Sequence, residues 1–181
     1  MTSLVIALTG TDHHPFERMV QWVDAAAERR GDVRFVVQHG STRPPRVAEG
    51  YDFLPHDRLV ALLEEAALVI CHGGPGTIMD AREAGHVPLC IPRDPLLGEH
   101  VDGHQQRFAS LAGGSGVVRL VSSPETVHSE LDSGLVPEPL LRAMRSATDD
   151  RDIARARAAA ELDSLVDTRR WRHGRLFRAA G

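Results

Sequence analysis

The stretch VICHGGPGTIMD, residues 69–80, decides the fold class of this chain. It joins an apolar run to three glycines and a proline, and then to a pattern that opens a helix. An apolar strand followed by a glycine-rich turn and a helix is a repeating unit of α/β proteins. Glycines let the backbone approach a ligand, and the first amides of a helix have no intrahelical acceptor, so this turn is suited to binding phosphate. A tight turn without a ligand would need the same glycines, and the loop alone leaves that alternative open.

Short apolar runs alternate with helical patterns on both sides of this stretch. Apolar strands separated by helices indicate a parallel sheet covered on both faces. We therefore expect an α/β fold, a doubly wound, mostly parallel, six-stranded Rossmann-like sheet, over residues 1–133. A C-terminal helical extension packed on it is expected over 134–181, with a basic tail from about 168. Strands are predicted within residues 4–10, 33–40, 51–55, 68–74, 87–92 and 116–121, and helices within 15–30, 56–67 and 76–85 and from 122.

Composition excludes several classes of function. All 21 basic residues are Arg, which removes Schiff-base lysine chemistry and the lysine of a P-loop. The G-x-G-x-x-G dinucleotide fingerprint is also not met. A net charge of −4 gives a nucleic-acid partner no electrostatic support. Cys71 and Cys90 lie in apolar runs and are interpreted as core thiols.

The N-terminal residues lack a basic region before their apolar run, and no apolar stretch approaches the roughly 20 residues of a membrane span. We therefore expect a cytoplasmic protein. Peripheral contact with the inner face of the membrane is compatible with this expectation. The last fourteen residues carry five Arg and no acid, interleaved with Trp171, Leu176 and Phe177. That pattern suits anionic lipid headgroups or a partner's groove, and a solvated terminus is the alternative.

Residues 72–105, HGGPGTIMDAREAGHVPLCIPRDPLLGEHVDGHQ, resemble the C-terminal, donor-binding domain of family 28 glycosyltransferases, which have the GT-B fold. The likeness is greatest to short stand-alone members, namely the donor subunit of two-part exopolysaccharide transferases and the catalytic subunit of the dolichol-linked chitobiose transferase. These share an opening strand that ends in Gly-Thr before a Pro-Phe helix start, seen here as LTGTDHHPF at 8–16. The resemblance spans about residues 4–130 and implies one half of a GT-B enzyme.

The resemblance implies which residues hold a UDP-sugar donor. His72 would contact the diphosphate, together with the amides of Gly74, Gly76 and Thr77. Asp80 stands where relatives place a Glu that binds the ribose. In the EHVDGHQ element, Gln105 and its neighbour His104 would reach the sugar. Helix-end amides and His72 can replace a divalent ion, so no metal and no cofactor are expected. The complete donor-binding set is Gly10, Thr11, His72, Gly73, Gly74, Gly76, Thr77, Asp80, Arg93, Glu99, His100, His104 and Gln105.

The remaining histidines leave alternatives open. His13 and His14 follow the first strand and are candidates for catalysis, although a solvated loop pair is equally consistent with the sequence. His100 and His104 are four residues apart, which would place both rings on one helical face, as in a zinc site. The H-E-x-x-H order is not met, so sugar binding is favoured over a metal. Glu99 could otherwise be a first-turn acid of that helix.

GT-B enzymes form their active site between two domains, and this chain has sequence for one. The resemblance therefore predicts the donor-binding subunit of a two-component inverting glycosyltransferase that moves a hexose-type sugar from UDP to a lipid-linked acceptor. A membrane-associated partner subunit would hold the acceptor and supply the general base. The rival predictions are a UDP-sugar-binding protein without transferase activity and a UDP-sugar epimerase or hydrolase.

Overall fold

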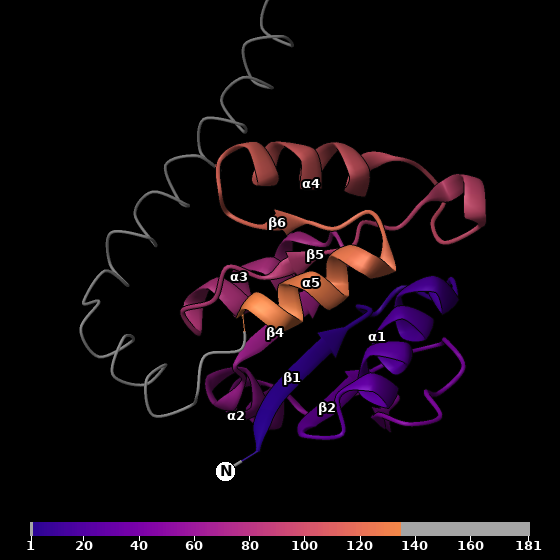
Figure 1. Cartoon of the computed structure of the whole chain (residues 1–181). Coiled ribbons are helices and arrows are strands. Elements are labelled where there is room, and N and C mark those ends of the chain that lie inside the picture. Colours follow the sequence, from indigo (N-terminus) through magenta and orange to yellow (C-terminus); the bar gives the residue numbers. More distant parts are fainter. Residues whose placement is uncertain (1, 135–181) are drawn as a thin grey trace, which may run out of the picture. The chain divides into compact units, whose positions relative to one another are not determined.

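The computed structural model describes residues 2–134, which form one six-stranded sheet with helices on both faces (Figure 1). The strand order is β3-β2-β1-β4-β5-β6, and every pairing is parallel. This confirms the doubly wound, Rossmann-like prediction. The strands are β1 Ser3–Leu8, β2 Val33–Gln38, β3 Glu49–Tyr51, β4 Leu68–Cys71, β5 Leu89–Cys90 and β6 Arg119–Leu120.

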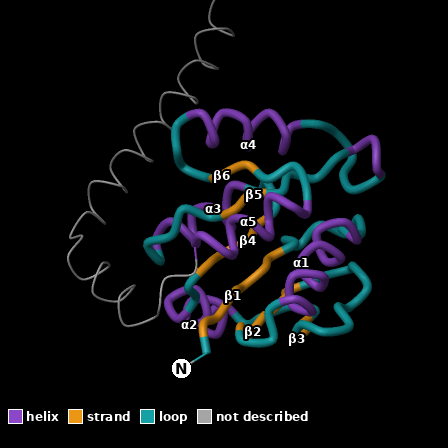
Figure 2. Tube along the Cα trace, in the orientation of Figure 1, coloured by secondary structure: helices purple, strands orange, loops and turns teal. Residues whose placement is uncertain are grey.

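Helices and loops alternate with the strands along the described chain (Figure 2). Because β1 pairs with both β2 and β4, the strand order reverses beside β1. Ligands of open α/β sheets bind outside the carboxyl ends of the strands at such a point. The helical elements are α1 Glu17–Arg29, α2 His56–Glu65, α3 Pro75–Glu83, the 3₁₀ turn η1 Pro95–Leu97, α4 His104–Gly114 and α5 Pro124–Gly134.

Two apolar clusters cover the two faces of the sheet. Alternate residues of β1 belong to different clusters, because successive side chains of a strand point to opposite faces. Val5 and Ala7 pack with residues of α1 and α5. Leu4 and Ile6 pack with residues of α2 and α3 on the other face. A third cluster seats α4 against the end of the sheet at β4 and β5.

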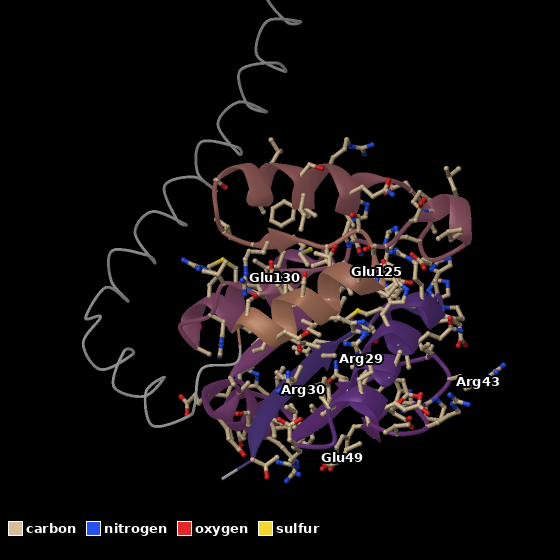
Figure 3. The ribbon with its side chains drawn as sticks, in the orientation of Figure 1. Arg29, Arg30, Arg43, Glu49, Glu125 and Glu130 are labelled. Atoms are coloured by element: carbon tan, nitrogen blue, oxygen red, sulfur yellow. The ribbon has the colours of Figure 1, made fainter. Side chains whose placement is uncertain are left out.

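The helices α1 and α5 lie side by side on the same face of the sheet (Figure 3). Arg29 and Arg30 at the end of α1 face α5, where Arg30 donates to Asp132 at 3.1 Å. Cys71 and Cys90 are free, buried and paired in register between β4 and β5. This confirms their interpretation as core thiols.

Two element boundaries differ from the predicted ones. β3 ends at Tyr51, so residues 52–55 form a loop instead of a strand. Helix α4 starts at His104, because Gly98 adopts a left-handed φ of 72° and Gly103 precedes the first helical residue. The interpretation of Glu99 as a first-turn acid, and that of His100 and His104 on one helical face, are therefore wrong. The predicted C-terminal extension and its Arg-rich tail lie outside the described residues.

Within the part of the chain that the structure describes, no helix has both the length and the apolar character that crossing a membrane requires.

Candidate donor-binding site

The glycine loop connects β4 to α3 as the sequence predicts. Gly74 precedes the helix in an extended conformation, and Pro75 is its first residue. Among the described residues, no side chain caps this helix start. The amides of Gly76 and Thr77 lie in the first turn and therefore have no intrahelical acceptor. Together with the positive end of the helix dipole, they form a place for an anion.

The imidazole of His72 lies between two glycines from different loops. A methyl group on Gly10 or on Gly74 would overlap the ring, so both positions require a residue without a side chain. Gly10 also has a φ of 83°, which other residues rarely adopt. The Nδ1 of His72 donates to the carbonyl of Leu8 at 3.3 Å. Burial, with a contribution from Arg93, lowers the pKa of His72 to about 4, so the free imidazole is neutral at pH 7.

A cavity of about 350 Å³ opens beside this loop at the carboxyl ends of β1, β2 and β4. It brings together seven of the residues that the sequence predicts for the donor, namely Gly10, Thr11, His72, Gly74, Gly76, Thr77 and Asp80. Burial and the nearby Glu83 raise the pKa of Asp80, against an opposing effect of His56. The same cavity is lined by six residues absent from the predicted set, which are Gln38, Phe53, Leu54, His56, Leu59 and Pro75.

Four of these additional residues come from the loop after β3 and from α2. The sequence pattern predicts a strand at residues 51–55 and therefore does not place these residues beside the glycine loop. The signal that could have placed them there is the Pro55–His56 helix start, which marks the preceding residues as a loop at the sheet edge. Phe53 is 57% exposed, which leaves its ring accessible to a ligand.

Arg93 lies beneath the loops and is only 1% exposed. Its guanidinium donates to three backbone carbonyls, those of Thr9 at 2.8 Å, His14 at 2.7 Å and Glu99 at 2.8 Å. One side chain therefore ties together the loop after β1 and the loop after β5. A donor-binding role of Arg93 stays a prediction, and the contacts in the structure give it a positioning role.

Glu99 is buried in an ion pair with Arg18 that the sequence pattern does not predict. Its carboxylate accepts two hydrogen bonds from Arg18, at 2.9 and 2.7 Å, and one from the amide of Asp94 at 2.7 Å. Arg18 also donates to the carbonyl of Pro92. This pair fastens helix α1 to the loop after β5. The predicted contact of Glu99 with a donor stays untested.

Gln105 is buried at the start of α4, against the backbone of the glycine loop. A methyl group on Gly73 would lie 3.0 Å from the carbonyl oxygen of Gln105, so these two backbones are in close contact. Within the described chain, the Oε1 of Gln105 has no hydrogen-bond partner. A buried amide oxygen without a partner is unfavourable, and a ligand hydroxyl or an ordered water would satisfy it. The amide is therefore a candidate sugar contact, as predicted.

His13, His14, His100 and His104 gather at the same edge, outside the residues that line the cavity. His14 donates through Nδ1 to Asp12 at 2.6 Å, and His100 lies 3.3 Å from the other oxygen of that carboxylate. The structure thus brings together the four predicted histidines through Asp12 and Asp102, two acids absent from the predicted site.

Comparison with known proteins agrees with this geometry. Residues 5–161 match the model of the glycosyltransferase family 28 C-terminal domain. The chain belongs to this glycosyltransferase family. The match includes all six strands except the first two residues of β1, and it agrees with the predicted half of a GT-B fold. No curated protein matches the chain in sequence.

Solved glycosyltransferases share the fold of this family 28 chain. The glycotransferase of kitacinnamycin matches with a TM-score of 0.61 at 17% identity, covering 90% of this chain and 43% of that one. CalG4, the calicheamicin glycosyltransferase, matches with a TM-score of 0.53 at 15% identity, covering 92% and 42%. The family 28 chain therefore spans less than half the length of these two proteins.

Proposed function

We propose that this family 28 chain is the donor-binding subunit of a two-component inverting glycosyltransferase that uses a UDP-sugar. The observation that carries the proposal is the cavity in which the glycine loop, His72 and Asp80 meet. The uncapped start of helix α3 and the buried histidine can bind the diphosphate of a nucleotide. The carboxylate in the same cavity can accept hydrogen bonds from the ribose.

The nucleotide is proposed to lie along this cavity. The diphosphate binds the amides of Gly76 and Thr77, and Asp80 accepts hydrogen bonds from the ribose hydroxyls. The uracil lies against Phe53 and Leu54, the exposed aromatic ring offering a stacking surface. A nearby diphosphate favours the charged form of an imidazole, so we expect its pKa to rise on binding and His72 to become a donor. These groups supply the charge stabilisation, and the donor needs no metal.

The sugar of the donor is proposed to extend toward Gln105 at the start of α4. The unpaired Oε1 of Gln105 would then accept a hydrogen bond from a sugar hydroxyl after a small movement of the side chain. An acceptor hydroxyl attacks the anomeric carbon in line, while UDP leaves toward the start of α3. This sequence of events inverts the anomeric configuration.

Nucleotide and sugar recognition should be separable by two substitutions. Asp80→Ala is expected to weaken UDP and UDP-hexose alike, because the ribose is common to both ligands. Gln105→Ala should weaken only UDP-hexose, because its amide contacts the sugar alone. Loss of one such hydrogen-bond set costs about 1–3 kcal/mol, which corresponds to roughly tenfold or more in affinity. Calorimetric titration of both variants with both ligands measures this, and equal losses for Gln105→Ala would remove it from the sugar site.

Transfer is proposed to require a second, membrane-associated subunit. The chain covers 43% of the kitacinnamycin enzyme, so it corresponds to one part of such a protein. The partner would hold a lipid-linked acceptor and supply the general base, with His13 and His14 as the candidates on this chain. The Arg-rich tail, residues 168–181, is proposed to dock on the partner or on the adjacent anionic membrane.

Activity should therefore appear only when both subunits are present. Correct positioning of an acceptor can supply up to about 7–11 kcal/mol of barrier reduction, and a donor domain alone lacks it. The purified chain is expected to show little transfer to a lipid-linked acceptor until its partner is added. Removal of residues 168–181 should impair the reconstituted activity and leave UDP binding nearly unchanged. Robust transfer by the lone chain, assayed by product formation, would contradict the two-component proposal.

A further inference from the structure

Two short segments at the carboxyl edge of the sheet bring four imidazoles and two carboxylates together. One segment is the loop between β1 and α1, and the other connects η1 to α4. Within each segment, the atoms able to bind a metal lie within 4.8 Å of one another. The two groups are Asp12, His13 and His14, and His100, Asp102 and His104.

Asp12 connects the two groups, which are together called the cluster below. The Nε2 of His100 lies 3.3 Å from the Oδ2 of Asp12. The ring centroids of His14 and His100 are 6.0 Å apart, and those of His100 and His104 are 4.7 Å apart. Imidazoles on one tetrahedral ion, with metal–nitrogen bonds of about 2.0–2.1 Å, have centroids about 5 Å apart. The rings of His100 and His104 have about this spacing, and the ring of His14 lies about 1 Å further from His100 than an ion shared in the present arrangement would require, so His14 would have to move slightly to bind it.

Two of these rings are held by carboxylates in the way that metal-binding histidines usually are. His14 donates through Nδ1 to Asp12 at 2.6 Å, and His104 makes the equivalent contact with Asp102. A carboxylate on one ring nitrogen fixes the tautomer and leaves the other nitrogen for a metal. Burial raises the pKa of Asp12, but hydrogen bonds from His14 outweigh it and hold the pKa below its ordinary value.

The cluster is held by a buried arginine on its inner side and is exposed to solvent on its outer side. Arg93 donates to the carbonyls of His14 and Glu99, so one buried side chain fixes both segments. The side chain of His100 is 8% exposed, whereas that of His104 is 52% exposed. An ion from solvent can therefore reach a site whose inner ligand is already held in place.

The ligand chemistry selects a class of metal. Imidazoles with supporting carboxylates suit Zn²⁺, Co²⁺ or Ni²⁺, whereas Mg²⁺ and Ca²⁺ prefer oxygen ligands alone. None of the described cluster residues is among those lining the nucleotide cavity. We propose that His14, His100 and His104, backed by Asp12 and Asp102, bind one divalent transition-metal ion of the Zn²⁺ type. A metal-bound His14 is not a general base, which leaves that role to the partner subunit.

The proposal is tested by metal titration of the full-length, tag-free chain after treatment with a chelator. Zn²⁺ should bind in competition with a chromophoric chelator, with one ion per chain and a Kd of about 1 μM or lower. Co²⁺ at the same site should give the visible absorption bands of a tetrahedral complex.

Substitutions locate the ion. His100→Ala and His104→Ala should each weaken Zn²⁺ binding at least about tenfold. His128→Ala, on helix α5, is the matched control and should leave binding unchanged. His104 is half exposed, so its variant should keep the wild-type melting temperature, and weaker Zn²⁺ binding would then reflect a lost ligand rather than unfolding. Binding of Zn²⁺ no tighter than millimolar, or binding that both cluster variants retain, would overturn the proposal whether or not the chain binds UDP.

Discussion

Replacing Gly74 by alanine is expected to lower the affinity for UDP at least about 100-fold, or about 2.7 kcal/mol. The backbone of Gly74 is extended and would accept alanine, so the effect comes from the new methyl group. That methyl would overlap the imidazole of His72 and push the ring out of its place between Gly10 and Gly74. The proposed site would lose a donor to the diphosphate and the close approach of the loop. Calorimetric titration with UDP measures the loss.

Gly76→Ala is the matched control for this change, two residues further along the chain in the first turn of α3. A methyl group on Gly76 meets nothing within 4 Å, and alanine is favoured over glycine in a helix. Its amide, the proposed phosphate contact, remains. UDP affinity should therefore stay within about threefold of wild type, a small fraction of the loss expected for Gly74→Ala. Equal affinities of the two variants would contradict the proposed place of the diphosphate.

Replacing Arg93 by methionine is expected to cost about 3–5 kcal/mol of folding stability. Methionine fills much of the same volume but leaves the carbonyls of Thr9, His14 and Glu99 without their donor. Each unpaired buried carbonyl costs about 1–3 kcal/mol, although water can satisfy some of them. A domain of this size has a stability of about 5–15 kcal/mol, so the variant should unfold at much lower urea concentration.

Arg46→Met provides the comparison for this loss. The side chain of Arg46 is 84% exposed, and its guanidinium lies 3.8 Å from Asp24. Exposed ion pairs contribute about 0–1 kcal/mol, and the bond from the Arg46 amide to Asp24 does not depend on the side chain. Urea unfolding of both variants separates a buried anchor from a surface arginine. A similar, small loss in both would mean that Arg93 does not hold the two loops.

Local sequence patterns were sufficient to predict the sheet and the glycine loop. The apolar runs of β1 and β4 are buried on both faces, and Gly74 and Pro75 mark the start of α3 by their own backbone preferences. These features depend on neighbours in the sequence, which is why the parallel sheet and the site at its carboxyl edge could be predicted.

The features that the sequence did not reveal depend on distant contacts. Arg93 reads as a surface residue, and only the meeting of three backbone segments makes it a buried anchor. Glu99 reads as a helix-start acid, whereas its partner Arg18 lies 81 residues away. The wall formed by Phe53 and Leu54 was missed because their apolar character is equally typical of a strand.

The most direct test of the donor-binding proposal is calorimetric titration of the purified chain with UDP in excess EDTA. The amides at the start of α3, His72 and Asp80 should bind UDP with a Kd of about 1 μM to 1 mM, and the Kd should be the same without EDTA. The outcome is independent of any ion held by His14, His100 and His104. Absence of UDP binding at millimolar concentration, or binding that disappears with EDTA, would contradict the metal-free nucleotide site proposed for this chain.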